Sequence, residues 1–205
     1  MTGQPDAIRD DISYIRNLAE QGRRGPILGG AFLAGAGVIY GLACPVQWAM
    51  QSGILPAPTP TSIAELWGGA SVIWAIVWFI LFQRLRNSGT AAPGASQIIF
   101  GSAWAACGLG IVVMLIAITI LSARLGDLEL MNVNPLVAFA FYGAAWFVSG
   151  ALSRQRWMFL VSLAAFALTL ALAAIPGANM LLVMGAGLFA TLVLPGLHLM
   201  RGVSR

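Results

Sequence analysis

Few side chains in this sequence could carry chemistry, and its long apolar runs hold hardly any ionisable groups. A relay for protons or ions inside a membrane needs such groups, because they bind or move the charge. The nearest candidates are Glu65 and His198, which both stand at the ends of apolar runs. Glu65 suits the first turn of a helix, where the helix dipole favours an acid. His198 is a candidate pH-responsive gate or a solvated interfacial residue.

Enzymatic chemistry lacks the residues that it would need. The chain has one histidine, which is fewer than a bis-histidine haem or a conventional zinc site requires. No second histidine or buried acid is available to serve as a base beside Ser71, Ser149 or Ser162. We therefore predict a protein that is not an enzyme, with no catalytic residues, no metal and no cofactor.

Aromatic and hydroxyl side chains could line a path for a small neutral solute. Four of them share one face of a predicted helix: Trp67, Ser71, Trp74 and Trp78. Other apolar runs contribute further amphipathic rings: Trp104, Tyr142 and Trp146. The alternative interpretation is that these rings fill space against lipid and against glycine-rich neighbours.

Pro195 is a candidate hinge near the end of the last apolar run. Proline removes one backbone hydrogen bond, so it frees the carbonyl of the residue four positions earlier, Thr191. A kink there, close to His198, could gate such a path. The alternative is that the helix bends or ends as it reaches the lipid headgroups.

Helices in a bilayer must position these residues. The chain has 205 residues, of which 59% are hydrophobic and 9% charged, whereas soluble domains carry about a quarter charged residues. Its mean hydropathy is +0.86. Six apolar runs approach the roughly 20 residues that span a membrane: residues 26–48, 65–83, 97–121, 134–153, 157–175 and 179–199. We predict an all-α polytopic membrane protein with six transmembrane helices in three antiparallel hairpins.

Residues 1–25 are predicted to form a cytoplasmic amphipathic helix that precedes the transmembrane domain of residues 26–205. Apolar residues form one stripe along it: Ile8, Ile12, Ile15 and Ala19. Acids offset its arginines, so docking onto the bundle or onto another protein is favoured over binding to anionic lipid.

The arginines predict the orientation of the chain. With both termini in the cytoplasm, only Arg124 would lie in an outer loop, and the other ten arginines would lie inside. Cytoplasmic loops of membrane proteins carry such an excess of basic residues. We therefore expect a multi-pass protein of the cytoplasmic membrane, whose surroundings are the lipid bilayer and whose partners do not include nucleic acid.

Small residues recur at helical spacing in two of the predicted spans. The first span contains Gly30, Ala34, Gly37 and Gly41, and the third contains Gly101, Ala105 and Gly108 with the same first intervals. Such faces let two helix backbones approach closely. They are candidate helix-packing faces, and they indicate either an internal repeat or a coincidence.

The run DDISYIRNLAEQGRR followed by GPILGGAFLAGAGVIYGL, together with GSAWAACGL and FYGAAWFVSG, resembles uncharacterised bacterial six-helix inner-membrane proteins. The resemblance covers the spacing of most of the chain. It implies a bacterial cytoplasmic membrane location and no particular activity.

Two functions remain as hypotheses. The first is a non-enzymatic interaction, structural or regulatory component of the membrane. It would contact a second copy, as a homo-oligomer, or a membrane-protein partner through its amino-terminal helix and its glycine-faced spans. The alternative is a channel or facilitator for a small neutral solute.

Overall fold

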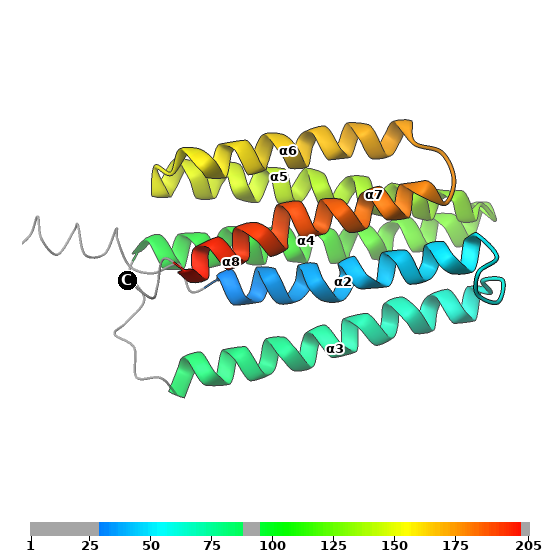
Figure 1. Cartoon of the computed structure of the whole chain (residues 1–205), viewed down its shortest axis with the longest axis horizontal. Helices are drawn as coiled ribbons and strands as arrows, with labels where there is room; N and C mark the ends of the chain where they lie inside the picture. Colours follow the sequence, from blue (N-terminus) through cyan, green and yellow to red (C-terminus); the bar gives the residue numbers. More distant parts are fainter. Residues whose placement is uncertain (1–28, 88–94, 202–205) are drawn as a thin grey trace, which may run out of the picture.

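The computed structural model describes residues 29–87 and 95–201, and these residues form helices and connecting turns without strands. The predicted amphipathic helix at residues 1–25 lies outside the described residues. Figure 1 shows the helices side by side with their long axes nearly aligned. The all-α prediction is confirmed for the described part of the chain.

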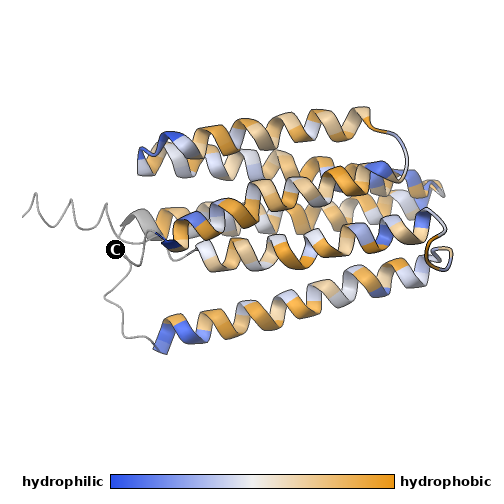
Figure 2. Ribbon diagram, viewed as in Figure 1, coloured by the Kyte–Doolittle hydropathy of each residue, from blue (hydrophilic) through white to orange (hydrophobic). Residues whose placement is uncertain are grey.

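Six helices in the described residues are long and apolar enough to cross a membrane. The first five are built from α2 (Gly30–Gln51), α3 (Pro60–Asn87), α4 (Ala95–Leu125), the short 3-10 turn η1 (Leu128–Asn132) that leads into α5 (Val133–Ser153), and α6 (Arg156–Ala174). The sixth combines α7 (Asn179–Leu188), the π turn η2 (Phe189–Val193) and α8 (Leu194–Arg201). Apolar residues occupy most of each helix, and hydrophilic residues gather toward the helix ends (Figure 2). This architecture is compatible with a multi-pass membrane protein.

Helix ends follow local sequence signals. The α2–α3 loop holds Pro56 and Pro58, and Pro60 occupies the first position of α3, where its missing N–H has no partner to lose. Thr59 caps this helix: its hydroxyl oxygen accepts from the Ser62 amide at 3.1 Å, and the Ser62 hydroxyl oxygen accepts from the Thr59 amide at 2.9 Å. This reciprocal pair starts α3 before the predicted start of the second span at residue 65.

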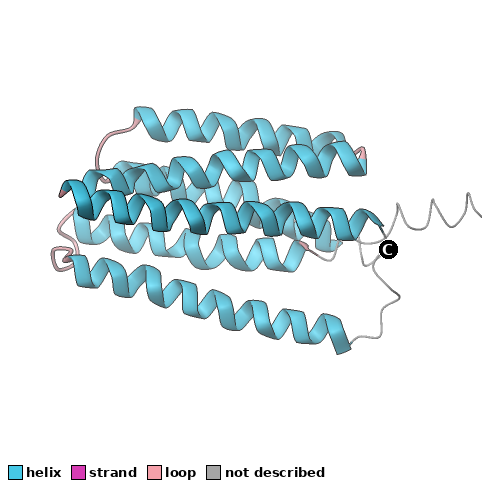
Figure 3. Cartoon of the chain, turned by 180° about the vertical axis from the view of Figure 1, so that it is seen from behind, coloured by secondary structure: helices cyan, strands magenta, loops and turns pink. Residues whose placement is uncertain are grey.

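Two helices organise the bundle. α5 packs against α4 and α6, whereas α2 packs against α3 and against the whole last span, α7 to α8. The last span also touches α6, less extensively. Figures 1 and 3 show α3 at one edge and α6 at the opposite edge.

Burial differs sharply among the spans. In the last span 56% of the apolar window is buried inside the structure, but only 6% is buried in α3 and 11% in α4. The core lies between the remaining helices, and its largest fully buried side chains include Trp146, Phe139 and Met158. α3 and α4 therefore turn most of their surface outward.

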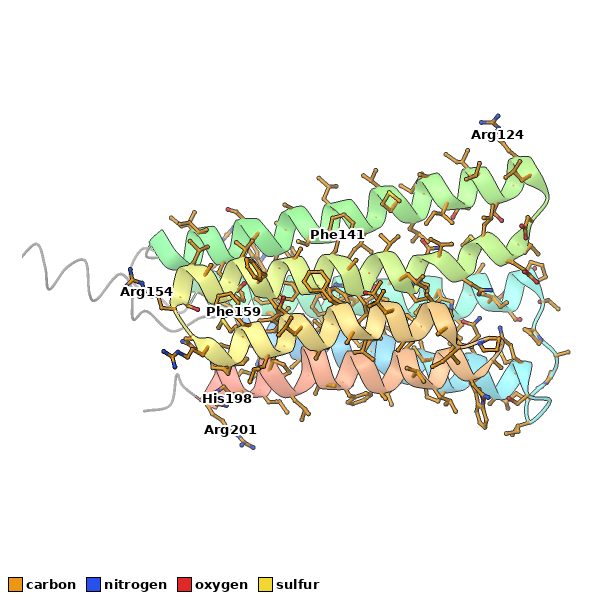
Figure 4. The ribbon with its side chains drawn as sticks, turned by 90° about the horizontal axis from the view of Figure 1, so that it is seen from above. Arg124, Phe141, Arg154, Phe159, His198 and Arg201 are labelled. Atoms are coloured by element: carbon orange, nitrogen blue, oxygen red, sulfur yellow. The ribbon has the colours of Figure 1, made fainter. Side chains whose placement is uncertain are left out.

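The charged residues separate along the bundle axis. Figure 4 places Arg154 and Arg201 at one end and Arg124 at the other. The described arginines in the α5–α6 turn and at the ends of α3 and α8 share the first end. The described acids, which are Glu65, Asp127 and Glu129, belong to the start of α3 and to the α4–α5 connection, at the opposite end.

Candidate functional site

The small-residue face of α2 lies against the last span. A Cβ atom built at Gly30 would lie 2.5 Å from the Gly196 carbonyl oxygen, and one built at Gly196 would lie 2.6 Å from the Gly30 carbonyl oxygen. Ala34 is buried beside this contact. A side chain at either glycine would force the two backbones apart, so the pair allows a close helix crossing.

The same contact continues along α2. A Cβ atom at Gly37 would lie 2.7 Å from a side-chain carbon of Val193, and one at Gly41 would lie 2.8 Å from the ring of Phe189. From the other side, a Cβ atom at Gly185 would lie 3.1 Å from the Gly41 carbonyl oxygen. The structure thus places all four predicted packing residues of the first span in one interface within the chain.

The corresponding residues of α4 have no such partner. Gly101, Ala105 and Gly108 are exposed, and no atom of the described chain lies within 4 Å of a Cβ atom built at Gly101 or Gly108. Gly110, on another face of α4, does pack inside the chain, because a Cβ atom there would lie 2.8 Å from the ring of Phe141 in α5. α4 therefore has one closed face and one open face.

The Thr191 carbonyl freed by Pro195 has a donor. The indole N–H of Trp146 in α5 donates to the Thr191 carbonyl oxygen at 2.9 Å, in a buried setting. The Thr191 hydroxyl donates to the Gly187 carbonyl oxygen at 2.7 Å. In lipid an unsatisfied carbonyl is costly, so Trp146 holds the π turn of the last span against α5. The Trp146 donor and the π turn were not predicted from the sequence.

A chain of aromatic rings extends from this bond to the arginine-rich end. Trp104 meets Trp146 edge to face at 5.2 Å between ring centroids, and Trp146 lies 5.6 Å from Trp157. His198 stands edge-on to Trp157 at 5.0 Å, with its side chain exposed. These rings tie α4, α5, α6 and α8 together. The indole nitrogen of Trp104 is buried without a hydrogen-bond partner in the described part of the chain.

The predicted tryptophan face of α3 contacts α2. The Trp67 indole donates to the Gln47 side-chain oxygen at 2.7 Å, and the Tyr40 hydroxyl donates to the Ser71 hydroxyl oxygen at 3.3 Å. Trp74 reaches within 3.0 Å of a Cβ atom built at Gly35. These contacts support the interpretation of this face as packing.

The same face remains aromatic toward the carboxyl-terminal end of α3. Trp78 stacks on Phe82 at 5.2 Å and meets Phe32 of α2 edge-on at 6.2 Å. α2 lies between α3 and the last span (Figure 1). The predicted path residues of α3 pack on α2, whereas Thr191 and His198 of the last span contact α5 and α6. The structure therefore does not bring the two predicted sets together.

Side chains with catalytic potential are engaged in backbone contacts. The Ser149 hydroxyl donates to the Ala145 carbonyl oxygen at 2.6 Å, and the Ser162 hydroxyl donates to the Gly143 carbonyl oxygen of α5 at 2.7 Å. Within residues 29–87 and 95–201, no group of three His, Cys, Asp or Glu residues could hold a metal ion.

Comparisons with protein-family models, with curated proteins and with solved structures found no match to this chain. The resemblance to bacterial six-helix inner-membrane proteins remains a prediction from sequence.

Proposed function

We propose that this chain is a non-enzymatic interaction component of a membrane, which binds a transmembrane helix of a second copy or of a partner protein through α4. The observation that carries this proposal is the open face of Gly101, Ala105 and Gly108, where no atom of residues 29–87 and 95–201 lies within 4 Å of a Cβ atom built at either glycine. The chain uses the same kind of face on α2 to bind its own last span.

The physical basis is the balance of contacts in lipid. Apolar helices gain little from mutual burial in lipid, because acyl chains are as apolar as leucine, so association depends on close packing. Small residues on α4 permit that close approach, and Leu109 and Val112 beside them are more than half exposed. A partner helix could therefore pack against α4 as closely as the last span packs against α2.

The proposal includes the membrane arrangement. The six spans cross as three antiparallel hairpins, with both termini and the end that carries Arg154 and Arg201 on the cytoplasmic side. The excess of arginine at that end supports this orientation. The channel hypothesis gains no specific contact in its favour, since the tryptophans of α3 pack on α2.

Photocrosslinking in native membranes tests the α4 interface. With p-benzoylphenylalanine at position 105, we expect one crosslinked product on a gel, which is either a dimer of this chain or a complex with a single partner protein. Gly101→Leu and Gly108→Leu should each lower the yield about tenfold, as expected when an interface loses roughly 1.4 kcal/mol. No described residue lies against either position, so the fold should tolerate the change.

Gly68→Leu is the matched control. Gly68 is an exposed glycine of α3, and no atom in the described part of the chain lies within 4 Å of a Cβ atom built there. The crosslinking yield should stay unchanged in this variant. A chain that is strictly monomeric in mild detergent and captures no partner in native membranes would remove the proposal. Equal losses from Gly68→Leu and Gly108→Leu would also remove it.

A further inference from the structure

Tyr142, in the middle of α5, carries a hydroxyl group that the rest of the described chain does not bind. The Tyr142 ring itself is well packed: it stacks on Trp104 of α4 at 6.2 Å between centroids and meets Phe139 edge-on at 5.8 Å. The hydroxyl forms no hydrogen bond within residues 29–87 and 95–201. Acyl chains offer no hydrogen bond either, so an unpartnered hydroxyl at this depth costs free energy in lipid.

The Tyr142 hydroxyl is not enclosed by the protein. Among the described residues, the Trp104 indole nitrogen is the only fully buried side-chain nitrogen or oxygen atom without a hydrogen-bond partner. The Tyr142 hydroxyl also lacks a partner but does not belong to this class. It must therefore be accessible from outside the packed rings.

That access lies on the side of α4 that carries its open face. On the other side α4 closes against α5, because the Phe141 ring fills the space beside Gly110 (Figure 4). Gly101 stands nine residues before Gly110, which is about two and a half helical turns, so it points away from α5. Trp104, on which Tyr142 stacks, lies one turn from Gly101 on the surface of α4.

We infer that the partner bound by α4 is a transmembrane helix of another protein, which carries a hydroxyl or amide side chain hydrogen-bonded to the Tyr142 hydroxyl. This inference rests on the proposed α4 interface and adds the chemistry of its occupant. The small residues of the open face let that helix approach closely. Hydroxyl and amide groups can both donate and accept, so either can pair with the phenol.

A second copy of this chain offers no such side chain on its own open face. Two copies inserted in the same orientation would bring their α4 helices together in parallel, so glycine and alanine would meet glycine and alanine at this depth. The Tyr142 hydroxyl would then stay without a partner. The chemistry of the site therefore favours a different protein over an α4–α4 dimer.

A matched pair of tyrosine variants tests this contact, with p-benzoylphenylalanine at position 105 in native membranes. Tyr142→Phe should lower the yield of the crosslinked product about threefold, the typical effect of one hydrogen bond between membrane helices. It should leave unfolding of the purified full chain by SDS unchanged, since the hydroxyl has no partner within the described residues.

Tyr40→Phe is the control, because it removes a hydroxyl that donates to the Ser71 hydroxyl oxygen inside the chain at 3.3 Å. This variant should unfold at a lower SDS fraction and leave the crosslinking yield unchanged. Equal losses of yield in the two variants would overturn the inference.

Mass spectrometry of the crosslinked peptide identifies the occupant. We expect a transmembrane segment of another protein with a serine, threonine, asparagine or glutamine within one turn of the crosslinked residue. A peptide from α4 of a second copy, a segment without such a residue, or an undiminished yield from Tyr142→Phe would each overturn the inference. If Gly108→Leu still lowered the yield in that last case, the α4 interface itself would stand, whereas the absence of any product from the wild type would remove both.

Discussion

The small-residue faces of α2 and α4 look alike in sequence and differ in use. On α2 the glycines bring the backbone of the last span so close that Gly30 and Gly196 leave no room for a methyl group. On α4 no described residue fills the space beside Gly101 and Gly108. Spacing alone therefore identifies a surface that can pack closely, but whether that surface is occupied depends on where the other helices lie.

The difference also separates stability from interaction. The α2 face belongs to the most buried span pair of the molecule, and the last span is 56% buried in its apolar window. α4 is 11% buried in its window and contacts α5 and η1. Substitutions on the α2 face should act on folding, whereas substitutions on the open α4 face should act on association.

The largest effect is expected from one methyl group on the small-residue face of α2. Gly30→Ala would place a Cβ atom 2.5 Å from the Gly196 carbonyl oxygen, so the two backbones must separate. We expect the free energy of unfolding to fall by about 2 to 3 kcal/mol, a typical cost of overpacking. Unfolding by SDS titration in mixed micelles measures this change.

Gly101→Ala adds the same group to the open face and serves as the control. Alanine favours helix over glycine by about 1 kcal/mol, and nothing in the described chain opposes the added methyl group at this position. The free energy of unfolding should stay the same or rise by up to about 1 kcal/mol. A comparable loss in both variants would contradict the division between the two faces.

The next effect concerns the bond that holds the π turn. Trp146→Phe removes the donor to the Thr191 carbonyl oxygen and leaves that carbonyl unsatisfied in a buried position. We expect a loss of about 1.5 kcal/mol in the free energy of unfolding. Unfolding monitored by circular dichroism in the same micelles measures it.

A double-mutant cycle separates the bond from the lost ring contacts. Pro195→Ala supplies a backbone N–H that can donate toward the Thr191 carbonyl oxygen. In that background the cost of Trp146→Phe should drop by about half or more, because the carbonyl keeps a donor. Strictly additive losses would show that the indole acts by filling space alone.

The sequence predicts the spans better than their contacts. Hydropathy identifies six apolar runs because lipid selects long apolar helices, and the structure has six such helices in its described residues. The first turns of α3 were missed because they contain polar and proline residues, although Thr59 and Ser62 form a recognisable cap. Hydropathy therefore places the start of this helix at residue 65 and not at Pro60.

The candidate site, too, could be predicted only in part from the sequence. The freed carbonyl of Thr191 could be predicted, since it follows from the chemistry of proline at position 195. Its donor, Trp146, lies 45 residues away in the chain, and only the packing of α5 against the last span brings it there. The sequence limits the possible indole donors to the tryptophans of the apolar runs, but it does not indicate which of them reaches the Thr191 carbonyl oxygen.

The smallest effect is expected on the opposite side of α2, where α3 packs. The Trp67 indole donates to the Gln47 side-chain oxygen at 2.7 Å, and Tyr40 stacks on Trp67 at 6.3 Å. Polar contacts between membrane helices contribute about 0.6 kcal/mol on average, so Gln47→Leu and Trp67→Phe should show a coupling of that size. Thermal unfolding of the single and double variants in detergent measures it.

This coupling tests whether the tryptophan face of α3 packs against α2 or lines a solute path. Only 6% of the apolar window of α3 is buried, so few contacts hold α3 against α2. The bond between Gln47 and Trp67 should therefore contribute a larger fraction of that contact energy than a single polar bond contributes between two core helices. If the tryptophans lined a solute path instead, the double variant would alter solute flux in proteoliposomes while the two thermal losses remained additive. A measurable coupling without flux would assign this face of α3 to packing.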